Sequence, residues 1–285
     1  MAIEFRPASA LSWAQLAELF NASYEGYVVP VQMTEAQIRA HVHNHDVLLE
    51  HSPVAYADAQ PVGLAALARR NDGGWVAGIG VIASRRQQGI GKRLLNALLE
   101  NACALGLTSV QLEVIAGNDA ARNLYLRAGF RDTRDLLVIA REPGPVAAPV
   151  WRGSFEKSTL ERALTAYERL HAVPNPWQRQ RESLLNQTSA PAAWLALDDG
   201  DIQAYAIGFF SAERLVLQDI GASPTHPEAV AALFAHLHTI YPEARASLVN
   251  LDSSDPAWPA LEQLGYQVTL RQHEMRVALT GSPQT

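Results

Sequence analysis

The fold is decided by a stretch in the first half of the chain, residues 75–95, which reads WVAGIGVIASRRQQGIGKRLL. An apolar run, residues 75–82, is predicted to be a strand that passes into a polar turn, and a helix over about 89–105 begins at two glycines. Apolar side chains then repeat at helical spacing and predict one core-facing stripe: Leu94, Leu95, Leu98, Leu99, Ala102 and Cys103. The turn is therefore expected to lie at the N-terminus of a buried helix.

The glycines of this turn, Gly89 and Gly91, allow a ligand to approach the backbone closely. A helix N-terminus exposes unpaired N–H groups and carries a partial positive charge, so it attracts anions. Four basic residues surround it in a chain whose net charge is −6, namely Arg85, Arg86, Lys92 and Arg93. The turn therefore predicts a site for a phosphorylated ligand.

Two common phosphate motifs fit this segment poorly. Residues 78–83 match the pattern G-x-G-x-x-G/A of dinucleotide-binding domains, but a polar turn follows where that motif requires the helix. The Walker pattern fails because it requires a glycine at position 86, which is arginine, and a serine or threonine after Lys92. A nucleotide-hydrolysing enzyme is not expected.

The composition of the whole chain narrows its class further. Its 285 residues are 48% hydrophobic and 18% charged, which favours two globular domains of ordinary size. The negative net charge argues against general nucleic-acid binding, which needs a clustered positive surface. A single cysteine excludes an internal disulfide, and no apolar run approaches the roughly 18 residues of a membrane span. We expect a cytoplasmic protein that binds neither nucleic acid nor membrane.

A proline-rich segment, residues 142–149, is predicted to be a linker between two domains. Residues 1–141 alternate between predicted strands and helices, and residues 150–285 partly repeat that order from the middle strands onward. The endings Gly129-Phe130 and Gly265-Tyr266 each close a predicted helix in the same way. The sequence therefore predicts two similar domains of the α/β (α+β) class.

Two motifs point to a known family. Arg86, Gly89 and Gly91 form the pattern R-x-x-G-x-G, which resembles the acyl-CoA pyrophosphate loop of the GNAT acetyltransferase superfamily. About thirty residues later, a second segment is similar to that family's strand and helix around the pantetheine arm: Leu112-Glu113-Val114, Asn118, Ala121, Leu124-Tyr125 and Ala128-Gly129-Phe130. The resemblance covers roughly residues 3–141 and implies a mixed central sheet flanked by helices in each half.

The resemblance implies an N-acetyltransferase that takes acetyl-CoA as its donor in the first domain. The backbone at Val81 and Ile82 would bond the pantetheine and the thioester carbonyl, Asn118 would contact the arm, and the Tyr125 hydroxyl would protonate the leaving sulfur. The spacing agrees, since residues 118, 121 and 125 share one helical face, although an amphipathic helix also buries such a tyrosine as an ordinary core residue. The remaining implied cofactor residues are Arg86, Gln87, Gln88, Gly89, Ile90, Gly91, Lys92 and Ala121.

The sequence departs from the family where a base is expected. Many members carry a glutamate on the strand before the loop, whereas residues 75–82 contain no acid. An alkyl ammonium near pKa 10.4 must lose a proton before it attacks a thioester. The alternatives are ordered waters, an acceptor amine of low pKa, or an acid from another element, for which Glu25, Glu113 and Asp46 are unranked candidates.

The acceptor amine, of a small molecule or a peptide, is expected near the segment that joins the first two predicted helices, residues 24–30. Tyr24, Glu25 and Tyr27 offer cation–π and ionic contacts there, although an ordinary packed loop explains them equally well. The sequence identifies neither the acceptor nor the oligomeric state. An acyl-CoA-binding sensor or interaction protein without catalysis is the rival hypothesis.

His41 and His45 lie one helical turn apart, as two metal ligands would. No third ligand is apparent, so we predict no metal and interpret these side chains as solvated polar residues.

The second half is predicted to be a degenerate GNAT-like domain, with an unrelated α/β module as the alternative. If Val81 is aligned with Ile220, Glu228 replaces Gly89, and a carboxylate stands where pyrophosphate needs bare backbone. When the two helix endings are aligned instead, a leucine replaces Tyr125. The second half therefore retains neither the glycine of the cofactor turn nor the tyrosine expected to protonate the leaving sulfur.

Overall fold

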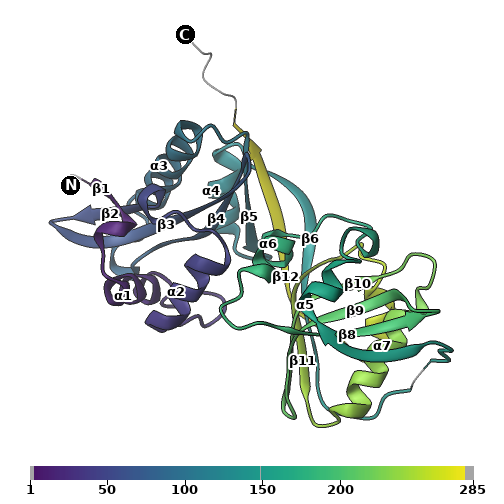
Figure 1. The fold of residues 1–285 in the computed structure, drawn as a ribbon. Coiled ribbons are helices and arrows are strands. Elements are labelled where there is room, and N and C mark those ends of the chain that lie inside the picture. Colours follow the sequence, from purple (N-terminus) through teal and green to yellow (C-terminus); the bar gives the residue numbers. More distant parts are fainter. Residues whose placement is uncertain (1–2, 148, 280–285) are drawn as a thin grey trace. The chain divides into compact units, whose positions relative to one another are not determined.

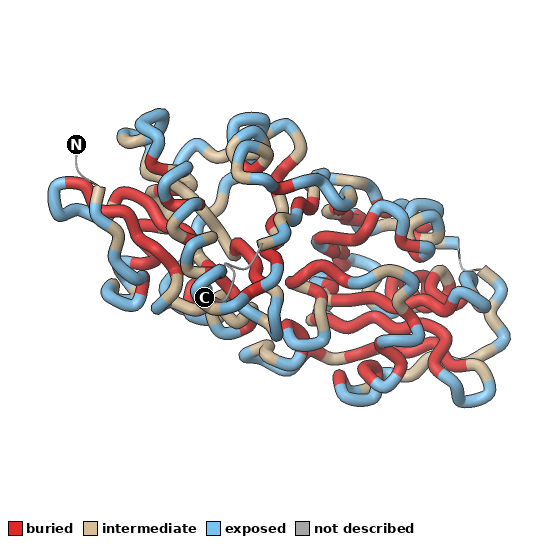
Figure 2. The backbone as a smooth tube through the Cα atoms, turned by 90° about the horizontal axis from the view of Figure 1, so that it is seen from above, coloured by how far each residue is buried: buried red, intermediate tan, exposed pale blue. Residues whose placement is uncertain are grey.

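The computed structural model describes residues 3–147 and 149–279, and the chain divides into two compact units (Figure 1). The first unit comprises Met1–Thr133 together with His273–Thr285, and the second comprises Arg134–Gln272. Buried residues are concentrated along the strands of both units (Figure 2). None of the helices in the described part of the chain is long and apolar enough to cross a membrane.

The first unit is a sheet in the order β1-β2-β3-β4-β5-β12. Its neighbours from β1 to β4 are antiparallel, whereas β4 and β5 are parallel and joined by a helix. Its elements are β1 (Glu4–Pro7), α1 (Trp13–Ser23), α2 (Glu35–Asn44), β2 (Pro53–Ala57), β3 (Gln60–Arg70), β4 (Gly73–Val81), α3 (Ile90–Ala104), β5 (Ser109–Ile115), α4 (Asp119–Arg127), the start of β6 (Arg131–Arg141) and the end of β12 (Gln267–Ala278).

The helices of this unit contribute to two separate hydrophobic clusters. The cluster with α3 and α4 contains Leu94, Leu98 and the alternate β5 residues Val110, Leu112 and Val114. The other cluster contains side chains of α1 and α2 packed with those of β2 and β3. Both α1 and α2 begin with a complete capping box, from Ser12 with Gln15 and from Thr34 with Gln37 respectively.

One expected core residue lies outside the core. Leu94, Leu95, Leu98 and Ala102 are fully buried on α3, as the leucine spacing predicts. Cys103 is instead exposed, with a free thiol. It follows Leu98 by five residues, which turns it about 140° away around the helix, so the predicted stripe ends at Ala102.

The second unit is a sheet in the order β12-β6-β11-β10-β9-β8-β7. Its only parallel pair among the ladders described is β10 with β11. Besides parts of β6 and β12, its elements are β7 (Ser154–Thr159), α5 (Leu160–Leu164), α6 (Arg181–Leu185), β8 (Ala192–Asp198), β9 (Asp201–Phe210), β10 (Arg214–Ala222), α7 (Glu228–Ile240), β11 (Arg245–Asp252) and α8 (Trp258–Gln263).

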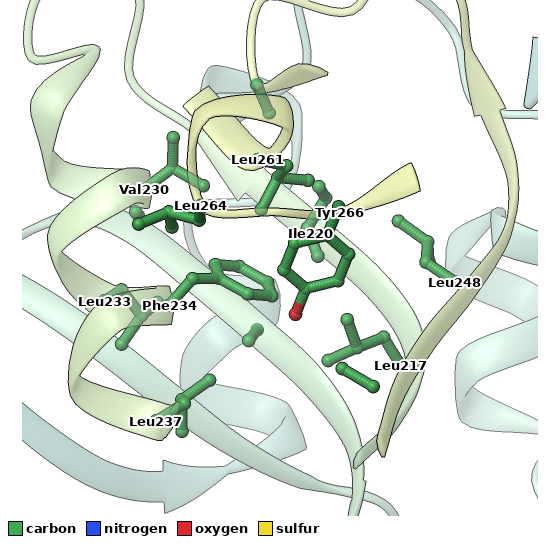
Figure 3. Close-up of a cluster of buried hydrophobic side chains, with 14 of the residues drawn as sticks. Leu217, Ile220, Val230, Leu233, Phe234, Leu237, Leu248, Leu261, Leu264 and Tyr266 are labelled. Carbon is green, nitrogen blue, oxygen red and sulfur yellow. The ribbon is translucent and has the colours of Figure 1, made fainter. Parts of the chain in front are cut away.

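The larger hydrophobic cluster of the second unit lies between its sheet and the helices α7 and α8 (Figure 3), and a second cluster contains side chains of α5, α6, β8 and β9. Phe234 of α7 meets the ring of Tyr266 edge-on at a centroid distance of 5.8 Å. Tyr266 is buried, and a hydrogen bond of 3.0 Å between its hydroxyl and Nε2 of His238 satisfies the polar group. The residue after Gly265 therefore packs beneath the helix, as its sequence pattern predicts.

The compact units do not follow the boundaries expected from the sequence, 1–141 and 150–285 around a linker at 142–149. Residues 273–278 of β12 belong to the first unit, where Met275 is completely buried. The proline-rich segment lies inside the second unit, since the Arg141 guanidinium donates to the carbonyls of Glu142, Gly144 and Pro145. Ala148, within the expected linker, lies outside the described residues.

Candidate active site

The sheet of the first unit opens between β4 and β5. Within the described residues, their parallel ladder pairs only residues 73–75 with residues 109–111. A register shift against β3 makes Ala77 an extra residue on β4, a β-bulge that bends the strand just beyond the last pair. Beyond the bulge, the described ladder leaves the β5 side of β4 without a strand partner.

Val81 and Ile82, at the end of β4, present their backbone groups in opposite directions. The Ile82 N–H donates to the Val62 carbonyl at 3.0 Å and is thus already bonded to β3. Successive residues of a strand alternate, so the N–H of Val81 points away from β3 and toward the gap. The geometry fits the ligand role expected for Val81 and does not fit it for the Ile82 N–H.

The glycine-rich turn leads into α3 as an open N-terminus. Gly89 is the N-cap at φ 75°, it supplies no side-chain cap, and a Cβ built there meets nothing within 4 Å. Gln87, at φ 61°, is also left-handed, and Gln88 and Lys92 are exposed beside it. Ile90 is buried in the core and fixes the helix start. These features suit an anion bound by backbone N–H groups.

The Arg86 side chain points elsewhere. Its Nε donates to the Val81 carbonyl at 3.0 Å, and its Nη2 donates to the carbonyls of Ser23 at 3.1 Å and Glu25 at 2.6 Å. The guanidinium expected among the cofactor ligands therefore joins the end of β4 to the end of α1.

Three tyrosines meet beside the gap. Tyr125 is buried on α4, and its pKa is raised by burial and then by its neighbours Tyr24 and Tyr27. The rings of Tyr24 and Tyr27 lie edge to face at a centroid distance of 5.2 Å. Asn118 caps α4 by accepting from the Ala121 N–H, and its Nδ2 lies 3.4 Å from the Tyr27 hydroxyl. Residues expected to hold the cofactor and residues expected to border the acceptor are thus brought together.

The Tyr24 hydroxyl lies at the β4 bulge. A Cβ added to Gly78 would be 3.3 Å from this oxygen, and the backbone of Ile79 makes a hydrogen bond with it. Burial, and then Tyr27, raises the pKa of Tyr24, so its hydroxyl stays protonated. The sequence singles out Tyr24 but gives no signal for its contact with Ile79, which depends on the bulge.

The three candidate acids occupy different places. Asp46 forms an ion pair of 2.7 Å with Arg70, and Glu25 is exposed beyond the end of α1. Glu113 lies on β5, where the Trp75 Nε1 donates to its carboxylate at 2.8 Å. Because Trp75 pairs with residue 111, Glu113 lies across the gap from the bulge on β4. Glu113 is therefore the candidate on a strand that borders the gap.

His41 and His45 are partly buried against Trp75 and are not fully solvated as expected. Their rings are 5.0 Å apart and lie 6.0 and 5.6 Å from the Trp75 ring. The His41 Nε2 lies 3.1 Å from the Ala77 carbonyl, which fixes this nitrogen as the donor. Burial lowers the pKa of both, and that of His45 falls to about 3 with further contributions from His41 and Arg70. In the described residues, no three His, Cys, Asp or Glu side chains are grouped as a metal site.

The second unit repeats the strand opening with a different register from the one expected. Its bulge on β10 is at Gln218. The Ser223 N–H donates to the Gln203 carbonyl, as the Ile82 N–H donates to the Val62 carbonyl in the first unit. Val81 therefore corresponds to Ala222 rather than to Ile220, a shift of two residues. The bulge, which the sequence does not reveal, sets this register. Residues 223–227 then form a shorter turn than residues 82–89, and α7 begins at Glu228.

An arginine fills the opening of the second unit. The described ladder between β10 and β11 stops at residues 217 and 248. Beyond it, Arg179 donates to the carbonyls of Ile220 and Asn250, one on each strand, at 3.4 and 3.3 Å. Its Nη2 also forms a buried ion pair of 2.8 Å with Asp219, which accepts from the Tyr205 hydroxyl as well. A side chain of the chain itself occupies this gap.

The bulge on β4, the opening between the parallel strands β4 and β5 and the uncapped glycine-rich start of α3 together form one candidate site. Residues 13–130 match the model of the acetyltransferase (GNAT) family. This part of the chain is thus similar to the acetyltransferases of the GNAT family.

Solved structures share the fold over nearly the whole chain. A GCN5-related N-acetyltransferase from Sphaerobacter thermophilus is 18% identical with a TM-score of 0.68, covering 99% of this chain and 98% of that one. A tandem GNAT protein from the clavulanic acid biosynthesis pathway is 15% identical with a TM-score of 0.72, covering 99% and 100%. A putative acetyltransferase from Pyrococcus horikoshii is 13% identical with a TM-score of 0.69, covering 98% and 90%. No curated protein matches the chain. The fold is thus that of two GNAT-like domains.

Proposed function

We propose that the first unit transfers an acetyl group from acetyl-CoA to a primary amine of a small molecule or peptide. The observation that carries this proposal is the opening between β4 and β5 beside the bare N-terminus of α3. The backbone N–H groups of residues 87–92 would bind the pyrophosphate, and the pantetheine arm would follow the gap past the Val81 N–H. The open space at Gly89 leaves the helix start accessible to phosphate oxygens.

The reaction is a direct attack. The neutral amine nitrogen forms a bond to the thioester carbon, the carbon–sulfur bond breaks, and the sulfur leaves with a proton from Tyr125. The proton that the nitrogen loses as the amide forms passes through water to Tyr125 and restores its hydroxyl. Burial raises the pKa of Tyr125, so this hydroxyl carries its proton at neutral pH and is available to the leaving sulfur. Asn118 and Ala121 flank the same helical face and would border the arm.

The proton of an ammonium acceptor would go to Glu113. It borders the gap opposite the β4 bulge, and the Trp75 indole orients its carboxylate. Tyr24 and Tyr27 would offer their rings to the cation before it is deprotonated, while Glu25 lies exposed beside them. The exposed free thiol of Cys103 suits the reducing cytoplasm, which we propose as the location.

The decisive experiment is a turnover screen of the full chain with acetyl-CoA and a broad amine panel of aminoglycosides, polyamines, amino acids and peptide N-termini. Release of free thiol that depends on one amine class supports the proposal. Acetyl-CoA binding without turnover on any amine supports the alternative, an acyl-CoA sensor, which the absence of an acid on β4 favours. No binding of acetyl-CoA contradicts both.

A further inference from the structure

The guanidinium of Arg86 reaches back across the β4 end to the helix that precedes the acceptor segment. Its hydrogen bonds, within the described part of the chain, go to the carbonyls of Val81, Ser23 and Glu25. We propose that Arg86 is a positioning residue that couples the acceptor segment, residues 24–30, to the cofactor turn, rather than a side-chain ligand of the pyrophosphate. This inference rests on the proposed function of the first unit.

The C-terminus of α1 needs donors that the helix itself does not supply. The last carbonyls of a helix have no intrahelical donor and carry a partial negative charge. The last turn of α1 contains no basic residue of its own. Arg86, more than sixty positions away in sequence, supplies both the donors and the positive charge at that end.

The end of α1 also lies very close to β4. A Cβ added to Gly80 would lie 2.8 Å from the Ser23 Cβ, so only glycine lets the helix end reach the strand. Ser23 is itself buried. The arginine therefore secures a contact that is already tight, and it fixes the point from which the acceptor segment leaves the helix.

The acceptor segment begins directly at this fixed point. Tyr24 comes after Ser23 and places its hydroxyl at the β4 bulge, and Tyr27 contacts Asn118 at the start of α4. A guanidinium that holds the carbonyls on both sides of Tyr24 limits where these two rings can go. Because Arg86 belongs to the turn that would bind pyrophosphate, filling that turn also steadies the acceptor segment. Acetyl-CoA is then expected to bind before the amine.

The test compares Arg86→Ala and Arg86→Lys with Arg69→Ala, which removes an exposed arginine of β3 outside the site. Acetyl-CoA affinity is measured by calorimetry, and kcat and KM are measured for the amine found in the screen. For Arg86→Ala we expect amine kcat/KM to fall by at least about tenfold more than acetyl-CoA affinity. Arg86→Lys should recover part of the loss, and Arg69→Ala should match the wild type. A loss in acetyl-CoA affinity that equals or exceeds the amine effect, or no loss in either, overturns the proposal.

A second readout does not depend on catalysis. Hydrogen exchange of residues 23–28 should become at least about tenfold faster in Arg86→Ala than in the wild-type chain. Added acetyl-CoA should slow that exchange in the wild type and not in Arg86→Ala. Unchanged exchange in Arg86→Ala overturns the positioning role even if the protein proves to be an acetyltransferase. Faster exchange in a chain that acetylates no amine retains the role and rejects the proposed function alone.

Discussion

At the scale of single residues, the site combines groups whose roles are set by burial. The spacing of α4 leads us to predict a role for Tyr125, and the structure adds that its pKa is raised and that Tyr24 and Tyr27 are its neighbours. The sequence gives no comparable signal for Ile79 or Ser23, because their contacts depend on a bulge and on a close helix-to-strand approach. Periodicity identifies which face of an element a residue occupies, and it does not report such local shifts.

We expect Tyr125→Phe to lower kcat by about 10²-fold while acetyl-CoA affinity stays within about twofold of the wild type. The substitution removes the hydroxyl that we propose as the proton donor and keeps the ring that packs with Phe130. Steady-state kinetics and equilibrium binding of acetyl-CoA measure the two effects. An unaltered kcat across the pH range would remove Tyr125 from the mechanism.

The lowered pKa of His45 makes stability depend on pH. The pKa of His45 is lowered to about 3, chiefly by burial and then by His41 and Arg70. Below about pH 6.5 the unfolded chain binds a proton that the folded chain refuses, so stability falls as pH falls through this window. We expect His45→Gln to reduce this loss by about 1.4 kcal/mol per pH unit.

Urea unfolding at pH 7, 6 and 5 measures the slope. His43→Gln, on the exposed side of the same helix, is the matched control for the substitution itself. Equal slopes for the wild type and His45→Gln would show that His45 is not held neutral by the fold.

At the scale of elements, the apolar stripe and the glycines predict the strand–turn–helix unit β4–α3 closely. For the corresponding unit β10–α7, alignment by local similarity is two residues out of register, because it cannot include the bulge at Gln218. The sequence also does not predict that a side chain fills the gap of the second unit. Arg179 lies some forty residues before Asp219, and nothing in the intervening pattern indicates that they pair.

The α3 helix offers a matched test of the cofactor turn. Gly89 and Gly106 flank its two ends, both are left-handed at φ 75° and 72°, and neither has an atom within 4 Å of a built Cβ. We expect Gly89→Glu to weaken acetyl-CoA binding by at least about 10²-fold, because it puts a carboxylate at the anion site. Gly106→Glu carries the same backbone cost and should leave the affinity within about twofold.

Isothermal titration with acetyl-CoA at fixed ionic strength compares the two variants. Similar losses in both would mean that backbone strain, and not the anion site, controls binding. Unchanged affinity in Gly89→Glu would place the pyrophosphate elsewhere.

At the scale of the whole molecule, the sequence predicts the number of similar halves and misplaces their boundaries. The proline-rich segment at residues 142–149 has the local composition of a linker between domains, so the sequence alone predicts a boundary there. Residues 273–278 belong to the first unit because they pair with strands that are distant in sequence. No local pattern in the sequence indicates such a pairing. Met275 looks like any apolar residue of a terminal strand, yet it completes the core around α3 and β5.

We therefore expect the fragment 1–141, the first domain as the sequence defines it, to be much less stable than the same unit in the full chain. It lacks β12, and the loss of the buried Met275 side chain alone costs about 2–5 kcal/mol. Joining residues 273–279 to residue 133 through a flexible linker should restore a cooperative thermal transition, followed by circular dichroism. A fragment 1–141 that melts as cooperatively as the joined form would contradict the strand's role.

The contribution of β12 to the first unit also determines the order in which the two units can fold during synthesis. Residues 134–272 are continuous and can fold as soon as they emerge from the ribosome, because domains generally fold as units during synthesis. The unit that is synthesised first must wait for the last strand, at residues 273–278, before its sheet is complete. Until then the side of β5 that pairs with β12 is open to other chains. The first unit, although it begins the sequence, is thus the last part of the molecule to complete its sheet.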